Sequence, residues 1–136
     1  MKKKFMSILA TVFTLSILVG VNAMASDRTE TIYLQKNQVW NVRASVTRSG
    51  QYSEVSARCY SVYPISGTDN FKKIQVIARD TLGKNITKLY TLNERDSEVT
   101  FVKINEGSLN VSNVVFAFRG NDADHPANAH VYYNGR

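Results

Sequence analysis

Apolar and polar residues alternate with a period of two along most of this 136-residue chain, and this pattern constrains the fold more than any other feature. In residues 40–47, for example, Trp40, Val42, Ala44 and Val46 alternate with polar residues. Successive side chains of a β-strand point to opposite faces, so this spacing predicts a half-buried strand with those four residues facing the core.

Similar short segments follow one another along the chain and are separated by turn-forming residues. No segment beyond the N-terminal apolar run has the 3.6-residue apolar spacing of an amphipathic helix. About eight strands are therefore expected, in an all-β, single-domain β-sandwich, and the jelly roll is one arrangement that fits this number of strands. The predicted strands are residues 31–34, 40–47, 54–62, 73–79, 86–92, 99–104, 109–118 and 129–133.

The alternation changes phase near Cys59, the chain's single cysteine. Val55, Ala57 and Cys59 fall on one face, whereas the pattern then shifts toward Tyr60 and Val62, which predicts a β-bulge. A lone cysteine cannot form an internal disulfide, so we expect a disulfide-free domain. Cys59 is interpreted as a small buried hydrophobic residue, and a reactive thiol or an intermolecular disulfide is the alternative.

The first 25 residues have the order of a secretory signal peptide. Lys2, Lys3 and Lys4 precede an apolar run over residues 5–21, and Ala23 and Ala25 occupy the positions that a signal peptidase reads. We therefore divide the chain into a leader, residues 1–25, cleaved after Ala25, and a β-sandwich domain, residues 26–136. An uncleaved membrane anchor is the alternative.

This leader predicts that the protein is secreted into the extracellular space, in the manner of an exported bacterial protein with few cysteines. We expect no stable membrane insertion of the mature chain. The whole chain has a net charge of +6, and without the three leader lysines it has 14 basic and 11 acidic residues, or +3. Such a mild and scattered positive charge does not predict nucleic-acid binding.

Two polar loops and the tyrosines near them are the predicted binding residues. Rigid sandwiches commonly carry function on their loops, here residues 64–70 and 119–128. Exposed tyrosines next to amides are typical of surfaces that bind sugars or proteins, although β-sheets also favour tyrosine without any functional reason. The candidates are Tyr60, Tyr63, Asp69, Asn70, Arg119, Asn121, Asp122, Asp124, His125 and Tyr132.

A metal site is predicted only weakly. Asp122 and Asp124 supply carboxylates at alternate positions, which could bind Ca²⁺, but the remaining ligands of a calcium loop are missing. The alternative is a solvated turn whose Asp and Asn side chains bind their own backbone. His125 and His130 lack the spacing of a zinc site. No cofactor is expected.

No catalytic motif can be assembled from this sequence, and the protein is not predicted to be an enzyme. The nucleophile elbow Gly-x-Ser-x-Gly and a glycine-rich phosphate loop are both absent, and most acidic residues lie in predicted turns. A glycosidase is the alternative, because its paired carboxylates can come from different strands and need not form a motif in the sequence.

Three functional hypotheses remain from the sequence. The first is a secreted, non-catalytic protein whose loops bind an extracellular polysaccharide or protein. The second is a secreted antagonist, either an antimicrobial polypeptide or a hydrolase inhibitor that uses residues 64–67 as its inhibitory loop. The third is a self-associating structural component. The oligomeric state is not predicted.

Overall fold

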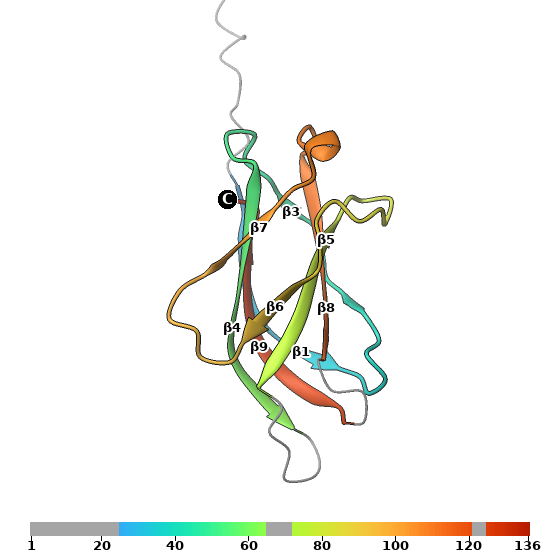
Figure 1. Ribbon diagram of the computed structural model, residues 1–136, viewed down its shortest axis with the longest axis vertical. Coiled ribbons are helices and arrows are strands. Elements are labelled where there is room, and N and C mark those ends of the chain that lie inside the picture. Colours follow the sequence, from blue (N-terminus) through green and yellow to red (C-terminus); the bar gives the residue numbers. More distant parts are fainter. Residues whose placement is uncertain (1–24, 65–71, 121–124) are drawn as a thin grey trace, which may run out of the picture.

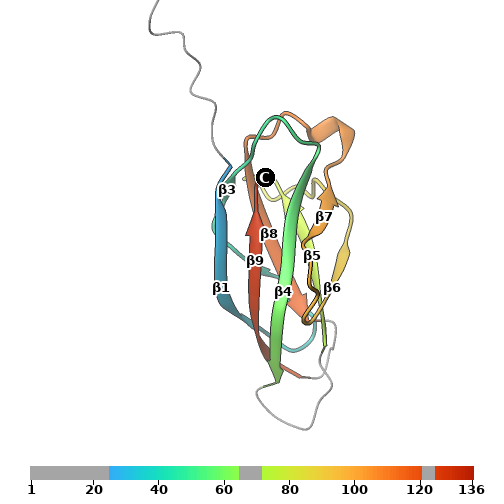
Figure 2. The same cartoon turned by 90° about the vertical axis from the view of Figure 1, so that its left-hand side faces the viewer.

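Two antiparallel sheets pack face to face in the computed structural model, which describes residues 25–64, 72–120 and 125–136 (Figure 1). The predicted β-sandwich is therefore confirmed. The first sheet has the order β1-β9-β4-β7, and Figure 2 shows these strands side by side with their outer face toward the viewer. Its strands are β1 (Asp27–Leu34), β9 (Ala127–Asn134), β4 (Glu54–Pro64) and β7 (Thr100–Lys103).

The second sheet has the order β2-β8-β5-β6, and the short strand β3 also pairs with β8. Its strands are β2 (Asn41–Val42), β3 (Val46–Thr47), β5 (Lys73–Arg79), β6 (Tyr90–Asn93) and β8 (Asn113–Gly120). A short 3-10 helix, η1 (Glu106–Ser108), precedes β8.

The strand pairs are nested along the sequence. β1 pairs with β9, β2 and β3 pair with β8, β4 pairs with β7, and β5 pairs with β6. If β2 and β3 are counted as two halves of one strand, this nesting gives the eight-stranded jelly roll.

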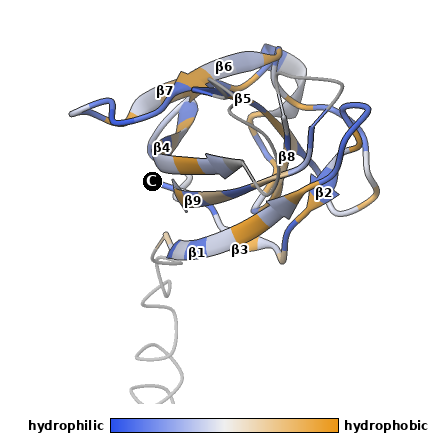
Figure 3. Cartoon of the chain, turned by 90° about the horizontal axis from the view of Figure 1, so that it is seen from below, coloured by the Kyte–Doolittle hydropathy of each residue, from blue (hydrophilic) through white to orange (hydrophobic). Residues whose placement is uncertain are grey.

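The core lies between the sheets and follows the alternation of the sequence (Figure 3). Tyr133 from β9 packs against Phe116 and Phe118 from β8, with ring centroids 5.0 and 5.7 Å apart. All three side chains are fully buried, so aromatic packing joins the two sheets at the centre of the sandwich. The burial of Phe116 and Phe118 follows the period of two within the predicted strand 109–118.

The prediction for residues 40–47 is wrong in its phase. Val42 is 52% exposed, Ala44 is exposed and Trp40 is half-buried, whereas Val46 is buried as expected. β2 and β3 pair with β8 in registers that differ by one residue. A shift of one residue moves side chains to the opposite face, so the segment cannot bury all four apolar residues on one side.

The predicted irregularity near Cys59 is confirmed. The pairing of β4 with β9 shifts between Cys59 and Ser61, which leaves Tyr60 as the extra residue. Cys59 and Val62 face the core on either side of the shift, and Tyr60 lies on the outer face. The bulge therefore places Tyr60 and Ser61 together on the outer face and returns Val62 to the core.

Other strand boundaries differ modestly from the predictions. β1 begins at Asp27 rather than residue 31, and β8 begins at Asn113 rather than residue 109 because η1 occupies the preceding turn. Within residues 86–92, only the C-terminal part enters β6, because Thr87 instead bridges to Ile104.

Candidate functional site: an aromatic face on the four-stranded sheet

The strand ends that flank the two predicted binding loops lie at the same end of the sandwich, the lower end in Figure 1. Pro64 at the end of β4 pairs with Ala127 at the start of β9, and Gly120 at the end of β8 pairs with Ile74 near the start of β5. Five of the predicted binding residues lie outside the described residues: Asp69, Asn70, Asn121, Asp122 and Asp124. The loop hypothesis, the calcium site and most of the proposed inhibitory loop therefore stay predictions.

A row of side chains crosses the outer face of the four-stranded sheet next to this end. Tyr33 of β1 and Tyr63 of β4 are both paired with Asn128 of β9, which lies between them. Neighbouring strands are about 4.8 Å apart, so the two tyrosines are separated by roughly 10 Å at the backbone. Tyr33 is 49% exposed and Tyr63 is 60% exposed.

The next row is centred on His130, which pairs with Thr31 on one side and Ser61 on the other. The bulge brings Tyr60 to this row, and its ring meets the His130 ring edge-on with centroids 5.3 Å apart. Tyr60 is 36% exposed and His130 is half-buried. The imidazole contact therefore restricts the orientation of the Tyr60 ring.

A third row contains Tyr132, which pairs with Thr29 and Arg58. Asn134 donates a hydrogen bond from Nδ2 to the Tyr132 hydroxyl at 2.8 Å. The Arg58 guanidinium lies 4.6 Å from the centroid of the Tyr60 ring, so a cation–π contact links the second and third rows.

We call this surface the aromatic face, and it is turned toward the viewer in Figure 2. It consists of Tyr33, Tyr60, Tyr63, Asn128, His130 and Tyr132. The three rows contain no carboxylate, so this surface lacks the paired acids of a glycosidase. Its rings can stack against a flat ligand, while its hydroxyl, amide and imidazole groups can form hydrogen bonds.

The structure thus brings together Tyr60, Tyr63 and Tyr132 of the predicted binding residues. Arg119 lies elsewhere, on the five-stranded sheet, and His125 is half-buried two residues before β9. Tyr33, Asn128 and His130 were not among the predicted binding residues. The available signal was their outward position in the alternation of β1 and β9, but strand order was needed to place them together.

Cys59 lies beneath this face rather than on it. Burial, with a smaller contribution from the negative charge of Glu94, raises the pKa of the Cys59 thiol to about 12. The thiol donates a weak hydrogen bond to the Ser61 carbonyl oxygen at 3.7 Å. This environment is that of an inert structural cysteine, as the sequence analysis favoured.

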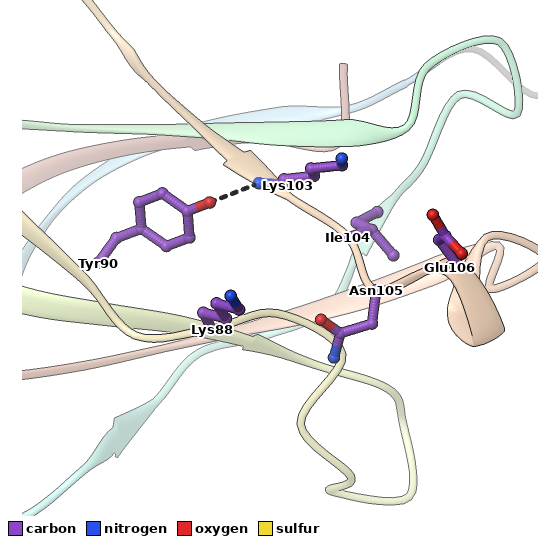
Figure 4. Close-up of a pocket in the computed structure, with 6 residues that line it drawn as sticks. All are labelled: Lys88, Tyr90, Lys103, Ile104, Asn105 and Glu106. Atoms are coloured by element: carbon purple, nitrogen blue, oxygen red, sulfur yellow. Dashed lines mark hydrogen bonds between the residues drawn. The ribbon is translucent and has the colours of Figure 1, made fainter.

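A separate hollow of about 390 Å³ opens on the side of the sandwich between β6 and β7 (Figure 4). The backbone N–H of Lys103 donates a hydrogen bond to the Tyr90 hydroxyl at 3.2 Å, which joins the two sheets at its margin. Both lysines and a glutamate are at its edge, so its charges are mixed. Its lining residues are Lys88, Tyr90, Lys103, Ile104, Asn105 and Glu106.

In residues 25–64, 72–120 and 125–136, no group of three or more histidine, cysteine, aspartate or glutamate side chains is arranged to hold a metal ion. Over the same ranges, no helix is long and apolar enough to cross a bilayer.

Comparisons of the chain with protein-family models, curated proteins and solved structures gave no match.

Proposed function

We propose that this protein is a secreted, non-catalytic binding protein that holds an extracellular polysaccharide on its aromatic face. The observation that carries the proposal is the row in which Tyr33 and Tyr63 flank Asn128 on adjacent strands. Sugar rings present flat C–H surfaces that stack on aromatic rings, and their hydroxyl groups bind amides and phenols. A row of two rings with an amide between them offers both kinds of contact to one chain of sugars.

The composition of the face favours a polysaccharide over a protein. Protein interfaces usually have a dry, apolar centre. Among the described residues, the exposed aliphatic side chains are outside the three rows, at Val39, Val42, Leu82, Leu89 and Leu109, and the exposed Phe101 of β7 is on the same sheet but also outside these rows. Every large exposed side chain in its three rows instead carries a hydroxyl group, which suits a hydroxyl-rich ligand.

Export through the leader is part of the proposal and is supported by the sequence. Cleavage after Ala25 would leave all nine described strands intact, because β1 begins at Asp27. The jelly roll is also an architecture that lectin domains use, although fold by itself does not determine function.

Affinity electrophoresis of the purified protein through gels that contain different neutral polysaccharides tests the proposal. We expect retardation by at least one polysaccharide. Replacing both Tyr33 and Tyr63 with alanine should weaken that binding by at least about tenfold. Each tyrosine ring that is removed contributes roughly 1 kcal/mol to the free energy of binding by stacking on a sugar.

The matched control is Tyr52→Ala, because Tyr52 is a similarly exposed tyrosine, 41%, at the opposite end of the sandwich. This variant should bind within about twofold of the parent protein. Circular dichroism of all variants would verify that they fold. The proposal fails if no polysaccharide retards the protein, or if the folded double variant binds as tightly as the parent.

A further inference from the structure

Two arginines meet one tryptophan on the outer face of the other sheet. The guanidinium carbon of Arg119 lies 4.4 Å from the centroid of the Trp40 ring, and that of Arg79 lies 5.5 Å from the same centroid. Arg119 is on β8 and Arg79 is on β5, whereas Trp40 immediately precedes β2. The register shift between β2 and β3 is what leaves Trp40 on this outer face.

The indole covers the middle of this face. Ile77 and Ala117 are paired with each other and point outward, yet both are buried. Arg79 and Arg119 lie at opposite ends of the same patch, since each is two residues farther along its strand. A ring that contacts both arginines therefore lies between them, which accounts for the burial of this apolar pair.

Each guanidinium group is oriented by one hydrogen bond. Arg119 donates from Nε to the side-chain oxygen of Gln75 at 2.6 Å, and Arg79 donates from Nε to the side-chain oxygen of Asn85 at 3.0 Å. Both acceptors are neutral amides. Among the described residues, no hydrogen bond occupies the terminal Nη atoms of either arginine, so their N–H groups can donate to a ligand.

Neither arginine forms an ion pair within the described part of the chain. The ion pairs there involve Arg43, Arg95 and Arg136. Asp80, the acidic neighbour of Arg79 in sequence, accepts hydrogen bonds from backbone N–H groups of the hairpin instead. Two like charges held around one ring repel each other, and an anion placed between them would offset that repulsion.

We infer that Trp40, Arg79 and Arg119 form a second binding site, which takes the carboxylate or phosphate group of an extracellular anionic polymer. Guanidinium groups bind such oxyanions through two parallel N–H···O bonds, which a planar, pre-oriented fork favours. This arginine site lies on the opposite sheet from the aromatic face, so it does not depend on the proposed polysaccharide binding there.

Trp40 is the single tryptophan of the chain, so its fluorescence reports directly on this site. The full chain would be titrated with polygalacturonate, which carries carboxylates, with poly(glycerol phosphate), which carries phosphates, and with neutral dextran. Calorimetry in parallel would measure affinity. We expect at least one anionic polymer to change the Trp40 emission and to bind, dextran to do neither, and added salt to weaken the binding.

The variants test whether the two arginines carry the binding. Arg119→Gln and Arg79→Gln should each lower the affinity by at least fivefold, and Arg119→Lys should lower it too, because lysine keeps the charge but not the fork. Arg95→Gln is the matched control, since it removes the same charge from an exposed arginine elsewhere and should change affinity by less than twofold.

Three results would overturn this inference. The first is a lack of binding to both anionic polymers, and the second is an equal response to dextran. The third is a loss of affinity in Arg95→Gln as large as that in Arg119→Gln, which would indicate that the polymer is attracted by the overall charge of the protein rather than by this site. The polymer that binds more tightly identifies the preferred oxyanion. The Tyr33→Ala, Tyr63→Ala double variant should keep its affinity for that polymer, which separates failure here from failure of the aromatic face.

Discussion

At the scale of single residues, Arg48 has an unusual position for a charged side chain. It is only 4% exposed, and burial lowers its pKa. Its Nη atoms donate hydrogen bonds to the backbone carbonyl oxygens of Tyr52, Leu109 and Val111. One side chain thereby satisfies the carbonyl groups of two separate loops, which identifies Arg48 as a structural residue.

Replacing Arg48 with methionine should therefore destabilise the protein. The apolar side chain would leave three carbonyl groups without their donors, and we expect a loss of about 2–4 kcal/mol in the free energy of unfolding. Arg48→Lys should recover only part of this loss, because an ammonium group cannot reach as many acceptors. Urea unfolding followed by circular dichroism measures both effects; a methionine variant as stable as the parent would contradict this assignment.

The buried thiol of Cys59 leads to a second prediction at this scale. Because its pKa is raised to about 12, almost no thiolate is present at pH 8, and the native protein should not react with iodoacetamide. In 6–8 M urea the same thiol should be alkylated readily. Mass spectrometry after timed labelling distinguishes these states, and rapid alkylation of the native protein would restore the reactive-thiol alternative.

At the scale of elements, a polar cluster ties the edge strand β1 to both sheets. Arg43 donates from Nε and Nη2 to the two carboxylate oxygens of Glu30, at 3.0 and 2.5 Å, and from Nη1 to the side-chain oxygen of Asn41. The Tyr133 hydroxyl donates to the same carboxylate. The hydrogen bond from Arg43 is the main reason that the pKa of Glu30 lies below its usual value.

This cluster predicts a dependence of stability on pH. Because the pKa of Glu30 is lower in the folded than in the unfolded state, its contribution is present in full above the usual value of 4.5 and is lost as the pH falls through the folded-state pKa. Glu30→Gln should cost about 1–3 kcal/mol at pH 7 and much less at pH 3.

Thermal unfolding of Glu30→Gln and the parent between pH 7 and pH 3 tests this expectation. The control is Glu98→Gln, because Glu98 is exposed. The stability of this variant should differ little from that of the parent at either pH. A difference between Glu30→Gln and the parent that stays constant over this range would show that the charge of Glu30 is not responsible.

At the scale of the whole molecule, the two ends of the described chain meet beside β3. Ser26 donates its backbone N–H to the Thr47 carbonyl at 3.1 Å, and Gly135 donates to the Ser26 carbonyl at 3.0 Å. A Cβ atom at Gly135 would lie 1.9 Å from the Thr47 carbonyl oxygen. This close approach of three backbone segments holds one side of the sandwich together.

Gly135→Ala should therefore destabilise the whole fold by about 2–3 kcal/mol, because the backbone of β3 must move to admit the methyl group. Gly107→Ala is the matched control, since a Cβ atom there would meet nothing within 4 Å. Differential scanning calorimetry compares the two variants, and equal melting temperatures for them would contradict the proposed close packing.

Several features of the fold were predictable because they depend on local alternation. Val55, Ala57 and Cys59 are buried as expected, and β-strands form in most of the predicted segments. The aromatic face was predictable only in part. Tyr60, Tyr63 and Tyr132 were identified as single residues, but pairing with β1 and β9 was needed to join them to Tyr33 and Asn128.

The sequence by itself determined the all-β class, because a period of two dictates strands with one buried face. Tertiary structure decided on which outer face of the sandwich Trp40 and Tyr60 lie. A one-residue register shift left Trp40 outside with Arg79 and Arg119, and the bulge after Cys59 turned Tyr60 toward His130. Register depends on pairing between strands that are distant in sequence. A shift of one residue moves the side chains of a strand to the opposite face of the sheet, although the apolar–polar alternation of the sequence stays the same.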